Sequence, residues 1–443
     1  MFQIPECLDK KFKKAVERLN GCSFIRVIAH YDADGVSSAS LIFNTINKLG
    51  KDLHISFLKD LSIENLKSVL NGNFDCLILV DLGSSFVSTL ESYNNVIILD
   101  HHPPEKDSEK IVHINPHFCN ISGTTDACGS TLSYIFSVYV NEDNWKEYPA
   151  FLSGVIGDKQ NVNGYSGLNK LIVDFLEDKG IKKLTDITLD GPTVKNMLLL
   201  ATDPFLPEYT GNEDAVSNVL NKLGIDPENS PSDMNEDLKT SLYSWIALNL
   251  LKRDVEHDII QSIIAEKHFI DSYGIWDITL SSYVDAASRM NMQGSALEFL
   301  NGNMNKKEEI IETWSNFKKL LIKELYSSMN SKIEMENIQY FYVQENSIAG
   351  AAAGILMNYA LNREKPVFAM HNSNGDVHVS GRATKTLIKK GLNLGSALRT
   401  CAEKNNGSGG GHDIAAGATI PGTKVDEFLN CLDITIGKQI EGS

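Results

Sequence analysis

Two short apolar runs that each end in an aspartate constrain the fold of this chain more than any other feature. Cys76–Asp81 (CLILVD) and Val96–Asp100 (VIILD) carry no charge before the final acid. Continuous apolar runs of this length are typical of strands in a parallel sheet that is covered on both faces. The sequence therefore predicts a buried sheet whose strands bring acidic side chains to one edge.

Strand-like and helix-like segments alternate through the first half of the chain. Phe24–His30 predicts a strand, Val36–Leu49 a helix, His54–Leu58 a strand and Ile63–Leu70 a helix. This alternation predicts βαβ units and an open α/β sheet. The later sequence is mostly helical before strand patterns return. We therefore expect an N-terminal α/β domain over residues 1–200, a mostly helical middle region over 201–335 and a smaller C-terminal α/β domain over 336–443.

Composition narrows the class of protein. No stretch approaches the roughly 18 uninterrupted apolar residues that a membrane span needs, and Met1–Lys14 lacks the apolar segment of a secretory signal. The seven cysteines are odd in number and contain no C-x-x-C pair. These features predict a cytoplasmic protein without membrane partners, whose cysteines are reduced and mostly buried.

Charge is unevenly distributed along the chain. The net charge of -16 argues against a broad basic surface for nucleic acid. Residues 363–404, however, carry eight Lys or Arg against three acids, whereas residues 203–237 carry nine acids against one Lys. One interpretation is that a basic C-terminal segment and an acidic middle face different partners. The other is that both are simply solvated surfaces.

Acidic residues stand where several predicted elements end. Carboxylates crowded at one sheet edge cannot all stay ionised unless cations offset their repulsion. Oxygen ligands with one or two imidazoles suit Mn²⁺ or Mg²⁺ better than a thiolate-seeking metal. A single acid of this kind is usually a helix cap or a turn residue, but the whole set is hard to obtain by chance. Its members are His30, Asp32 and Asp34, then Asp81, then Asp100 with His101 and His102, and finally Asp158.

The set predicts a site for two divalent cations, with Mn²⁺ favoured over Mg²⁺. Two such ions about 3.5–4 Å apart can activate water and clamp a phosphodiester. We assign as catalytic metal ligands Asp32, Asp34, Asp81, His101 and Asp158. Asp81 is the expected bridge, and His30 is either a further ligand or a supporting residue. His102 is expected to face the phosphate as donor or general acid, and Asp100 to orient a histidine.

A second cluster lies near the C-terminus. Ser408 and three glycines, Gly409, Gly410 and Gly411, precede His412. Such a run is often only a flexible loop, but its backbone N–H groups can also approach a phosphate closely. Upstream, Ser380 and Arg382 follow a predicted strand, and guanidinium suits paired phosphate oxygens. Together with the local positive charge, these residues predict phosphate binding.

These segments resemble those of a known family. HYDADG, VDLG, LDHH and the segment around Asp158 are similar to the signature motifs of DHH phosphoesterases, and SGR and GGGHDIAAGA to their DHH-associated C-terminal domain. The segment from Val284 to Met290 (VDAASRM) resembles the linker motif of RecJ nucleases. The nearest resemblance is to archaeal RecJ-like proteins, the group of the GINS-associated nuclease, and it runs over nearly the whole chain.

The resemblance implies a DHH domain and a smaller domain across a cleft. It implies that two Mn²⁺ or Mg²⁺ ions are held by the aspartates assigned above as metal ligands together with His101. It also implies that phosphates are bound near His102, Arg289, Arg382 and His412. It implies an exonuclease for single-stranded DNA or RNA, linked to DNA replication or repair through the GINS complex, with the acidic middle at about residues 205–270 as the contact. Asp285 and Ser288 depart from the linker pattern, which usually has Asn and Gly there, and His30 replaces an acid of the bacterial enzymes.

Other functions fit parts of the pattern. Relatives with the same motifs act on oligoribonucleotides or cyclic dinucleotides, although the long helical middle favours a nuclease. A pyrophosphatase fits the acids but not the glycine run. A replication scaffold related to a helicase subunit, with little catalysis, is the remaining alternative, and the complete set of predicted metal ligands argues against it. Cleavage polarity and sugar preference leave no sequence signature.

Overall fold

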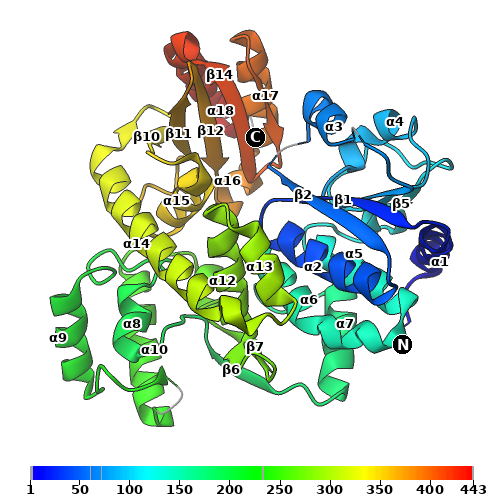
Figure 1. Ribbon diagram of the computed structural model, residues 1–443. Helices are drawn as coiled ribbons and strands as arrows, with labels where there is room; N and C mark the ends of the chain where they lie inside the picture. The colour runs from blue at the N-terminus through cyan, green and yellow to red at the C-terminus, as the bar shows by residue number, and fades with distance from the viewer. Residues whose placement is uncertain (1–2, 60, 71, 232–233, 442–443) are drawn as a thin grey trace. The chain divides into compact units, whose positions relative to one another are not determined.

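The computed structural model describes residues 3–59, 61–70, 72–231 and 234–441 (Figure 1). The chain divides into two compact units. The first unit comprises Met1–Thr188 and Ile264–Ser315, and the second comprises Leu189–Ile263 and Asn316–Ser443. The division into three domains remains a prediction, whereas the predicted α/β class is confirmed.

The first unit is built on a five-stranded sheet with the order β2-β1-β3-β4-β5. All of its neighbouring strands run parallel. The carboxyl ends of the strands therefore meet at one edge, as the apolar runs predict. The strands are β1 (Phe24–His30), β2 (Asp52–Leu58), β3 (Cys76–Val80), β4 (Val96–Leu99) and β5 (Val112–Ile114).

Helices cover both faces of this sheet. Side chains from alternate positions of β3 enter two different apolar clusters, Ile78 in one and Leu77 in the other, because successive strand residues point to opposite faces. One cluster holds α1 (Glu6–Asn20), α2 (Ala33–Lys48), α5 (Gly129–Val140) and α6 (Tyr148–Gly157) against the sheet. The other holds α3 (Ile63–Val69) and α4 (Val87–Leu90). This double cover explains why the strands read as continuous apolar runs.

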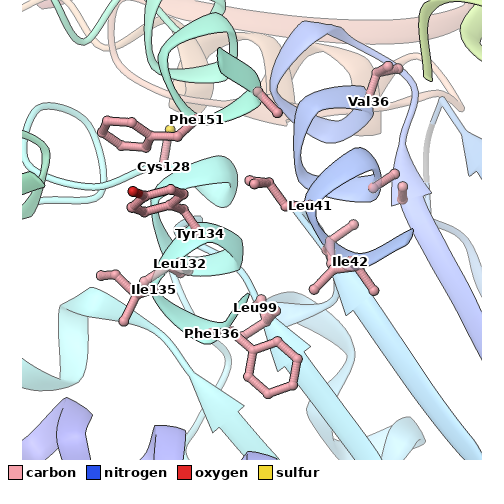
Figure 2. Close-up of a cluster of buried hydrophobic side chains, with 14 of the residues drawn as sticks. Val36, Leu41, Ile42, Leu99, Cys128, Leu132, Tyr134, Ile135, Phe136 and Phe151 are labelled. Carbon is pink, nitrogen blue, oxygen red and sulfur yellow. The ribbon is translucent and has the colours of Figure 1, made fainter. Parts of the chain in front are cut away.

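The larger cluster fixes the helices that carry several predicted site residues. Figure 2 shows Leu41 of α2, Leu132 and Phe136 of α5, Phe151 of α6 and Leu99 of β4 within it. Each of these side chains is fully buried. Burying one such side chain contributes about 1.5–3 kcal/mol, so α2, α5 and α6 are held firmly against this face of the sheet.

The remainder of the first unit includes strands that the helical pattern did not predict. A three-stranded antiparallel sheet has the order β6-β7-β8. Its β6 and β7 strands pair across about 80 residues of sequence, which local periodicity does not reveal. The elements are α7 (Gly167–Asp178), β6 (Lys183–Ile187), β7 (Ile264–Ile270), β8 (Ile275–Trp276), α12 (Asp277–Arg289) and α13 (Gln293–Leu300).

The second unit contains the helices of the acidic middle region and a six-stranded sheet with the order β13-β14-β12-β11-β10-β9. The long helix α14 (Lys307–Ser331) begins in the first unit and ends in the second. The helices are α8 (Val194–Leu199), α9 (Glu213–Leu223), α10 (Glu236–Leu251), α11 (His257–Gln261), α15 (Asn346–Tyr359), α16 (Lys385–Lys389), α17 (Leu394–Lys404) and α18 (Val425–Glu441). The strands are β9 (Ile333–Glu334), β10 (Gln339–Tyr342), β11 (Val367–Ser373), β12 (Asp376–Arg382), β13 (Ser408–Gly411) and β14 (Ala415–Pro421).

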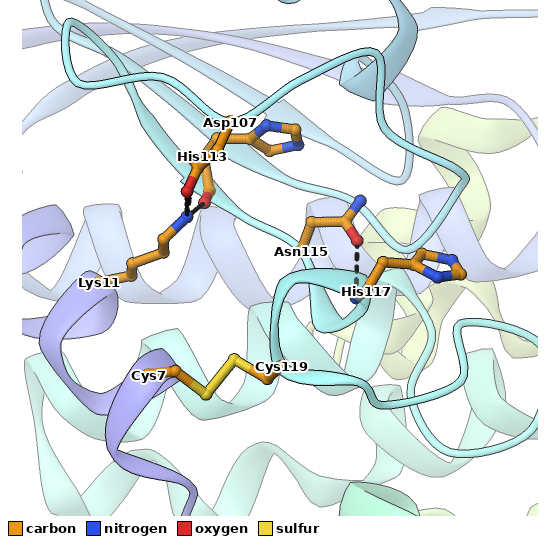
Figure 3. Close-up of a disulfide and its surroundings, with 7 residues drawn as sticks. All are labelled: Cys7, Lys11, Asp107, His113, Asn115, His117 and Cys119. Carbon is orange, nitrogen blue, oxygen red and sulfur yellow. Dashed lines mark hydrogen bonds and ion pairs between the residues drawn. A yellow bond between two sulfur atoms is a disulfide. The ribbon is translucent and has the colours of Figure 1, made fainter.

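The expectation of reduced cysteines is wrong for four of the seven. Cys7 and Cys119 form a disulfide (Figure 3), and so do Cys401 and Cys431. The partners are 112 and 30 residues apart in sequence, so only the tertiary fold brings them together. Cys22, Cys76 and Cys128 are free and buried, as predicted. Among the described residues, no helix combines the length and apolar character needed to cross a membrane.

Candidate metal centre

The predicted acids of the first unit converge at the carboxyl edge of the parallel sheet. His30 ends β1, and Asp32 caps the N-terminus of α2 by accepting a hydrogen bond from Gly35 N at 3.1 Å. Asp34 lies in the first turn of the same helix, and Asp81 follows β3. Asp81 adopts a left-handed backbone conformation, with φ of 58°. Non-glycine residues held this way concentrate at functional sites, where the surrounding fold over-determines them.

Asp81 lies at the middle of the cluster. Its Oδ2 is 3.2 Å from His30 Nδ1, and its Oδ1 is 3.2 Å from His101 Nε2. His30 Nδ1 also lies 3.0 Å from Asp32 Oδ2. On the other side, His101 Nε2 lies 4.0 Å from Asp34 Oδ2 and His101 Nδ1 lies 3.9 Å from Asp158 Oδ2. The residues assigned as metal ligands thus form one continuous group, with Asp81 touching both histidines.

Buried backbone groups orient Asp34. Its two carboxylate oxygens accept hydrogen bonds from Gly129 N at 2.6 Å and Ser130 N at 2.8 Å, at the start of α5. Only 2% of Asp34 is exposed. The positive end of the α5 dipole favours a carboxylate at this point.

Charge crowding in the cluster supports a cation. Burial and the charges of Asp81 and Asp158 raise the pKa of Asp34 to about 8. Burial also raises the pKa of Asp158 to about 6, against the opposing effect of His101. Asp81 Oδ1 is buried and lies 3.2 Å from His101 Nε2, but no well-formed hydrogen bond reaches it within the described part of the chain. Divalent cations would satisfy a buried oxygen of this kind amid crowded carboxylates, so the residues fit such ions.

The second histidine has a different environment. His102 Nδ1 lies 2.7 Å from Asp100 Oδ1, and Asp100 Oδ2 accepts a hydrogen bond from Ser84 N at 2.8 Å. The His102 side chain is 40% exposed, compared with 9% for His101. Burial opposes protonation of His102, but Asp100 outweighs it and raises the pKa of the imidazole. His102 is therefore oriented by a carboxylate and accessible to a ligand.

Cys128 is a member of the cluster that sequence reasoning missed. Ligand atoms of Cys128, Asp34 and Asp158 lie within 4.8 Å of one another. Burial raises the pKa of the Cys128 thiol well above its usual value, and the charges of Asp34 and Asp158 act in the same direction. A neutral thiol is a poor metal ligand. Cys128 stands outside every recognised motif, so no sequence signal marked it.

The crowded cluster predicts an unusual pH dependence for the metal-free protein. Asp34 and Asp158 have raised pKa values, and His30 and His101 do too, because carboxylates outweigh the opposing effect of burial. Between about pH 6.5 and 8, the folded state therefore holds protons on Asp34 and the two histidines that the unfolded chain releases, so stability falls as pH rises. Asp158 acts in the same direction but below this window, between about pH 4 and 6. Each unit of pKa difference is worth about 1.4 kcal/mol. His113, whose pKa burial lowers to about 4, contributes only below this window.

Thermal unfolding in EDTA and in saturating Mn²⁺ across this pH range measures the effect. We expect the Tm to fall by several degrees in EDTA and to stay nearly constant in Mn²⁺, because bound cations replace the protons. A Tm that is flat or rises with pH in EDTA would contradict the charge crowding described above.

Arg289 also belongs to the first unit. It is the last residue of α12, and its Nε donates to both oxygens of Asp285, at 3.0 and 2.9 Å. Asp285, an acid where the linker pattern usually has Asn, therefore forms an ion pair with Arg289. Ser288 is buried and donates a hydrogen bond to Val284 O at 2.8 Å.

The predicted phosphate-binding residues of the C-terminal region belong to the second unit. Ser380 and Gly410 pair with Gly417 of β14 from its two sides, so β12 and β13 bring them near one another. Arg382 ends β12, and a Cβ at Gly350 of α15 would come within 2.7 Å of its guanidinium. The possibility of a flexible glycine loop is wrong, because Ser408, Gly409, Gly410 and Gly411 form the edge strand β13, directly followed by His412.

Two family models match the chain. The N-terminal domain of the DHH family matches residues 24–155, and the DHHA1 domain matches residues 336–438. An uncharacterized protein of Methanocaldococcus jannaschii is 31% identical over 97% of this chain and 98% of its own length. A putative prophage-derived single-strand DNA-specific exonuclease of Bacillus subtilis, YorK, is 26% identical over 40% of this chain. The chain spans only 32% of the YorK sequence.

Solved structures share the fold. RecJ of Thermus thermophilus in complex with Mn²⁺ matches with a TM-score of 0.60 and 17% identity. That match covers 99% of this chain and 56% of the RecJ chain. CDC45 of Entamoeba histolytica matches with a TM-score of 0.67 and 12% identity, over 97% of this chain and 98% of CDC45.

Proposed function

This chain is a RecJ-like member of the DHH superfamily, and on that premise we propose that it is a metal-dependent exonuclease for single-stranded DNA or RNA. The observation that carries the proposal is the buried cluster at the sheet edge. Burial and the charges of Asp81 and Asp158 raise the pKa of Asp34, and no well-formed hydrogen bond reaches the buried Asp81 Oδ1 within the described residues. Such an arrangement is costly unless cations bind it. A protein that served only as a scaffold would gain nothing from a cluster that destabilises its folded state.

We assign two divalent cations to this cluster, with Mn²⁺ preferred and Mg²⁺ possible. The ligands would be Asp32, Asp34, Asp81, His101 and Asp158, with Asp81 shared and His30 close enough to contribute. When bound, such a pair supplies an activated water and charge stabilisation for a phosphodiester. Asp34 is held in place by backbone N–H groups, so its carboxylate is pre-oriented for this role.

His102 is the proposed proton donor. Its Nδ1 is hydrogen-bonded to Asp100 Oδ1 at 2.7 Å. The proton on Nδ1 therefore stays in this hydrogen bond, and Nε2 is the nitrogen that would face the substrate. Because Asp100 raises the pKa of His102, a proton at Nε2 is available near neutral pH for a phosphate oxygen or the leaving oxygen.

Arg289 and the residues of the second unit would bind backbone phosphates. Arg289 lies within electrostatic range of Asp32. In the second unit, the phosphate ligands would be Ser380, Arg382, Gly409, Gly410, Gly411 and His412, in a segment of local positive charge. The name of the Bacillus relative, a putative exonuclease specific for single-stranded DNA, supports this substrate class.

A link to replication is a further part of the proposal. The resemblance to archaeal RecJ-like proteins suggests GINS as a partner, and the CDC45 fold is compatible with a replication complex. The acidic middle, with helices α9 and α10, is the proposed contact. The CDC45 match also favours the alternative of a scaffold with little catalysis, which the following experiment separates.

Digestion of end-labelled single strands tests the activity. DNA and RNA strands carrying a label at either end are incubated with the protein and Mn²⁺, and products are resolved as a ladder. We expect stepwise shortening from one end that EDTA abolishes. Absence of cleavage with Mn²⁺ and Mg²⁺ would favour the scaffold, and strong preference for dinucleotides would favour a small-substrate phosphodiesterase.

A further inference from the structure

The proposed phosphate ligand Arg289 forms an ion pair with Asp285, a residue to which the chemistry above gives no role. Asp285 and Arg289 are one helical turn apart on α12, and their side chains are only 30% and 25% exposed. Both oxygens of Asp285 accept from Arg289 Nε. A half-buried pair is screened less by water and salt than a surface pair. Asp285 is accordingly the strongest of the influences that raise the pKa of Arg289.

Arg289 also acts on the segment that follows β1. Asp32 is one of the charged groups within electrostatic range of its guanidinium. Tyr31 is a further neighbour in electrostatic range. Asp285 is bound directly to the Nε edge of the guanidinium, and the metal-ligand segment around Asp32 lies within electrostatic range of the same group.

Carboxylate and phosphate compete for the same guanidinium surface. Both accept paired N–H bonds from arginine, and both gain most where water is partly excluded. A phosphate that binds Arg289 must share its charge with Asp285 or displace that carboxylate. We propose that Asp285 sets the affinity of the first unit for the phosphates of single-stranded nucleic acid by competing for Arg289. This inference rests on the proposed function and identifies Asp285 as the residue that adjusts the affinity for the strand.

Asp285 therefore weakens the binding of a strand by Arg289. With Asp285 ionised, Arg289 presents less net positive charge to a phosphate, so a shortened strand is released more readily. An exonuclease must release or shift its strand after every cleavage. Asp285 is thus a positioning residue that acts through Arg289.

The variant Asp285→Asn isolates the charge. Asparagine keeps a side-chain oxygen near Arg289 Nε while removing the negative charge. Binding of a labelled 12-nucleotide DNA strand is measured by fluorescence anisotropy in Ca²⁺, and the strand is checked on a gel to be intact. We expect the Kd to fall about fivefold. The slope of log Kd against log salt should steepen by about 0.7, the value for one additional phosphate contact on a single strand.

Two controls test whether the effect is specific to the pair of Asp285 and Arg289. Asp174→Asn, on α7, breaks a pair with Lys170 of the same helical spacing but high exposure, and it changes net charge equally. It should alter the Kd by less than about twofold. In an Arg289→Ala background, Asp285→Asn should have no effect on Kd, because the competing partner is gone.

Several outcomes overturn the inference. An unchanged or weaker affinity of Asp285→Asn does so, and so does a gain that persists without Arg289. Titration of each variant with Mn²⁺ alone gives an independent readout. If Asp285→Asn weakens Mn²⁺ binding, Asp285 serves to keep Arg289 away from Asp32, which also overturns it. If the wild-type protein fails to bind the strand, the proposed function itself fails.

Discussion

Replacing Asp34 with alanine is expected to abolish Mn²⁺-dependent cleavage. Loss of residues that merely support a metal ligand typically costs 10–100-fold, so loss of a ligand should cost more than about 100-fold. Asp34 is buried, and two backbone N–H groups fix both of its oxygens, so no neighbouring side chain can take its place. The measurements are the cleavage rate with Mn²⁺ and the binding of Mn²⁺ by titration calorimetry.

Asp174→Ala provides the matched control for this prediction. Asp174 is also a helical aspartate of the first unit, but its side chain is 54% exposed and pairs with Lys170. Its removal should leave both rate and Mn²⁺ affinity within about twofold. A folded Asp34→Ala protein that cleaves at the wild-type rate would refute the assignment of the metal centre.

Gly154→Ala is expected to damage the same centre without touching a ligand. A Cβ at this position of α6 would lie 2.2 Å from Ser130 Oγ and 2.6 Å from Asp34 Oδ1. α6 must therefore move away from α2 and α5, which disturbs both the packing and the orientation of Asp34. Overpacking of this kind costs about 1–3 kcal/mol. The expected result is a lower Tm together with Mn²⁺ affinity reduced by at least about tenfold, since a small misplacement of a catalytic group is costly.

Gly294→Ala separates this steric effect from the general effect of removing glycine from a helix. Gly294 lies in α13 of the same unit, and a Cβ there meets no described atom within 4 Å. Alanine is favoured over glycine in helices by about 1 kcal/mol, so this variant should be neutral or slightly stabilised. If Gly154→Ala were equally harmless, the close approach of α6 to Asp34 would not limit the site.

Both substitutions address one physical problem, which is how the chain tolerates crowded carboxylates. The cluster is supported by the α5 N-terminus, by the two histidines and by close helix packing at Gly154. Bound cations would complete this compensation. The metal-free protein should consequently be less stable than the loaded protein, and most clearly so above neutral pH, where the carboxylates lose their protons.

The sequence alone predicted the parallel sheet and the acidic residues that converge at its edge. Apolar runs such as Cys76–Asp81 predicted buried parallel strands, because a strand covered on both faces has no polar side. The observed strand β3 ends one residue before the acid. Since parallel strands end at one edge, the acids could be assigned to one cluster before any distance was known.

Only the tertiary structure decided features that depend on contacts between distant segments. Cys128 beside Asp34 and the disulfide between Cys7 and Cys119 both required partners far away in sequence. The glycine run became a strand by pairing with the neighbouring strand β14, which its own composition does not reveal. The pairing of Asp285 with Arg289 spans only one helical turn, yet its importance depends on Asp32, more than 250 residues earlier. Local periodicity records which face of an element is buried, but it does not record what that face meets.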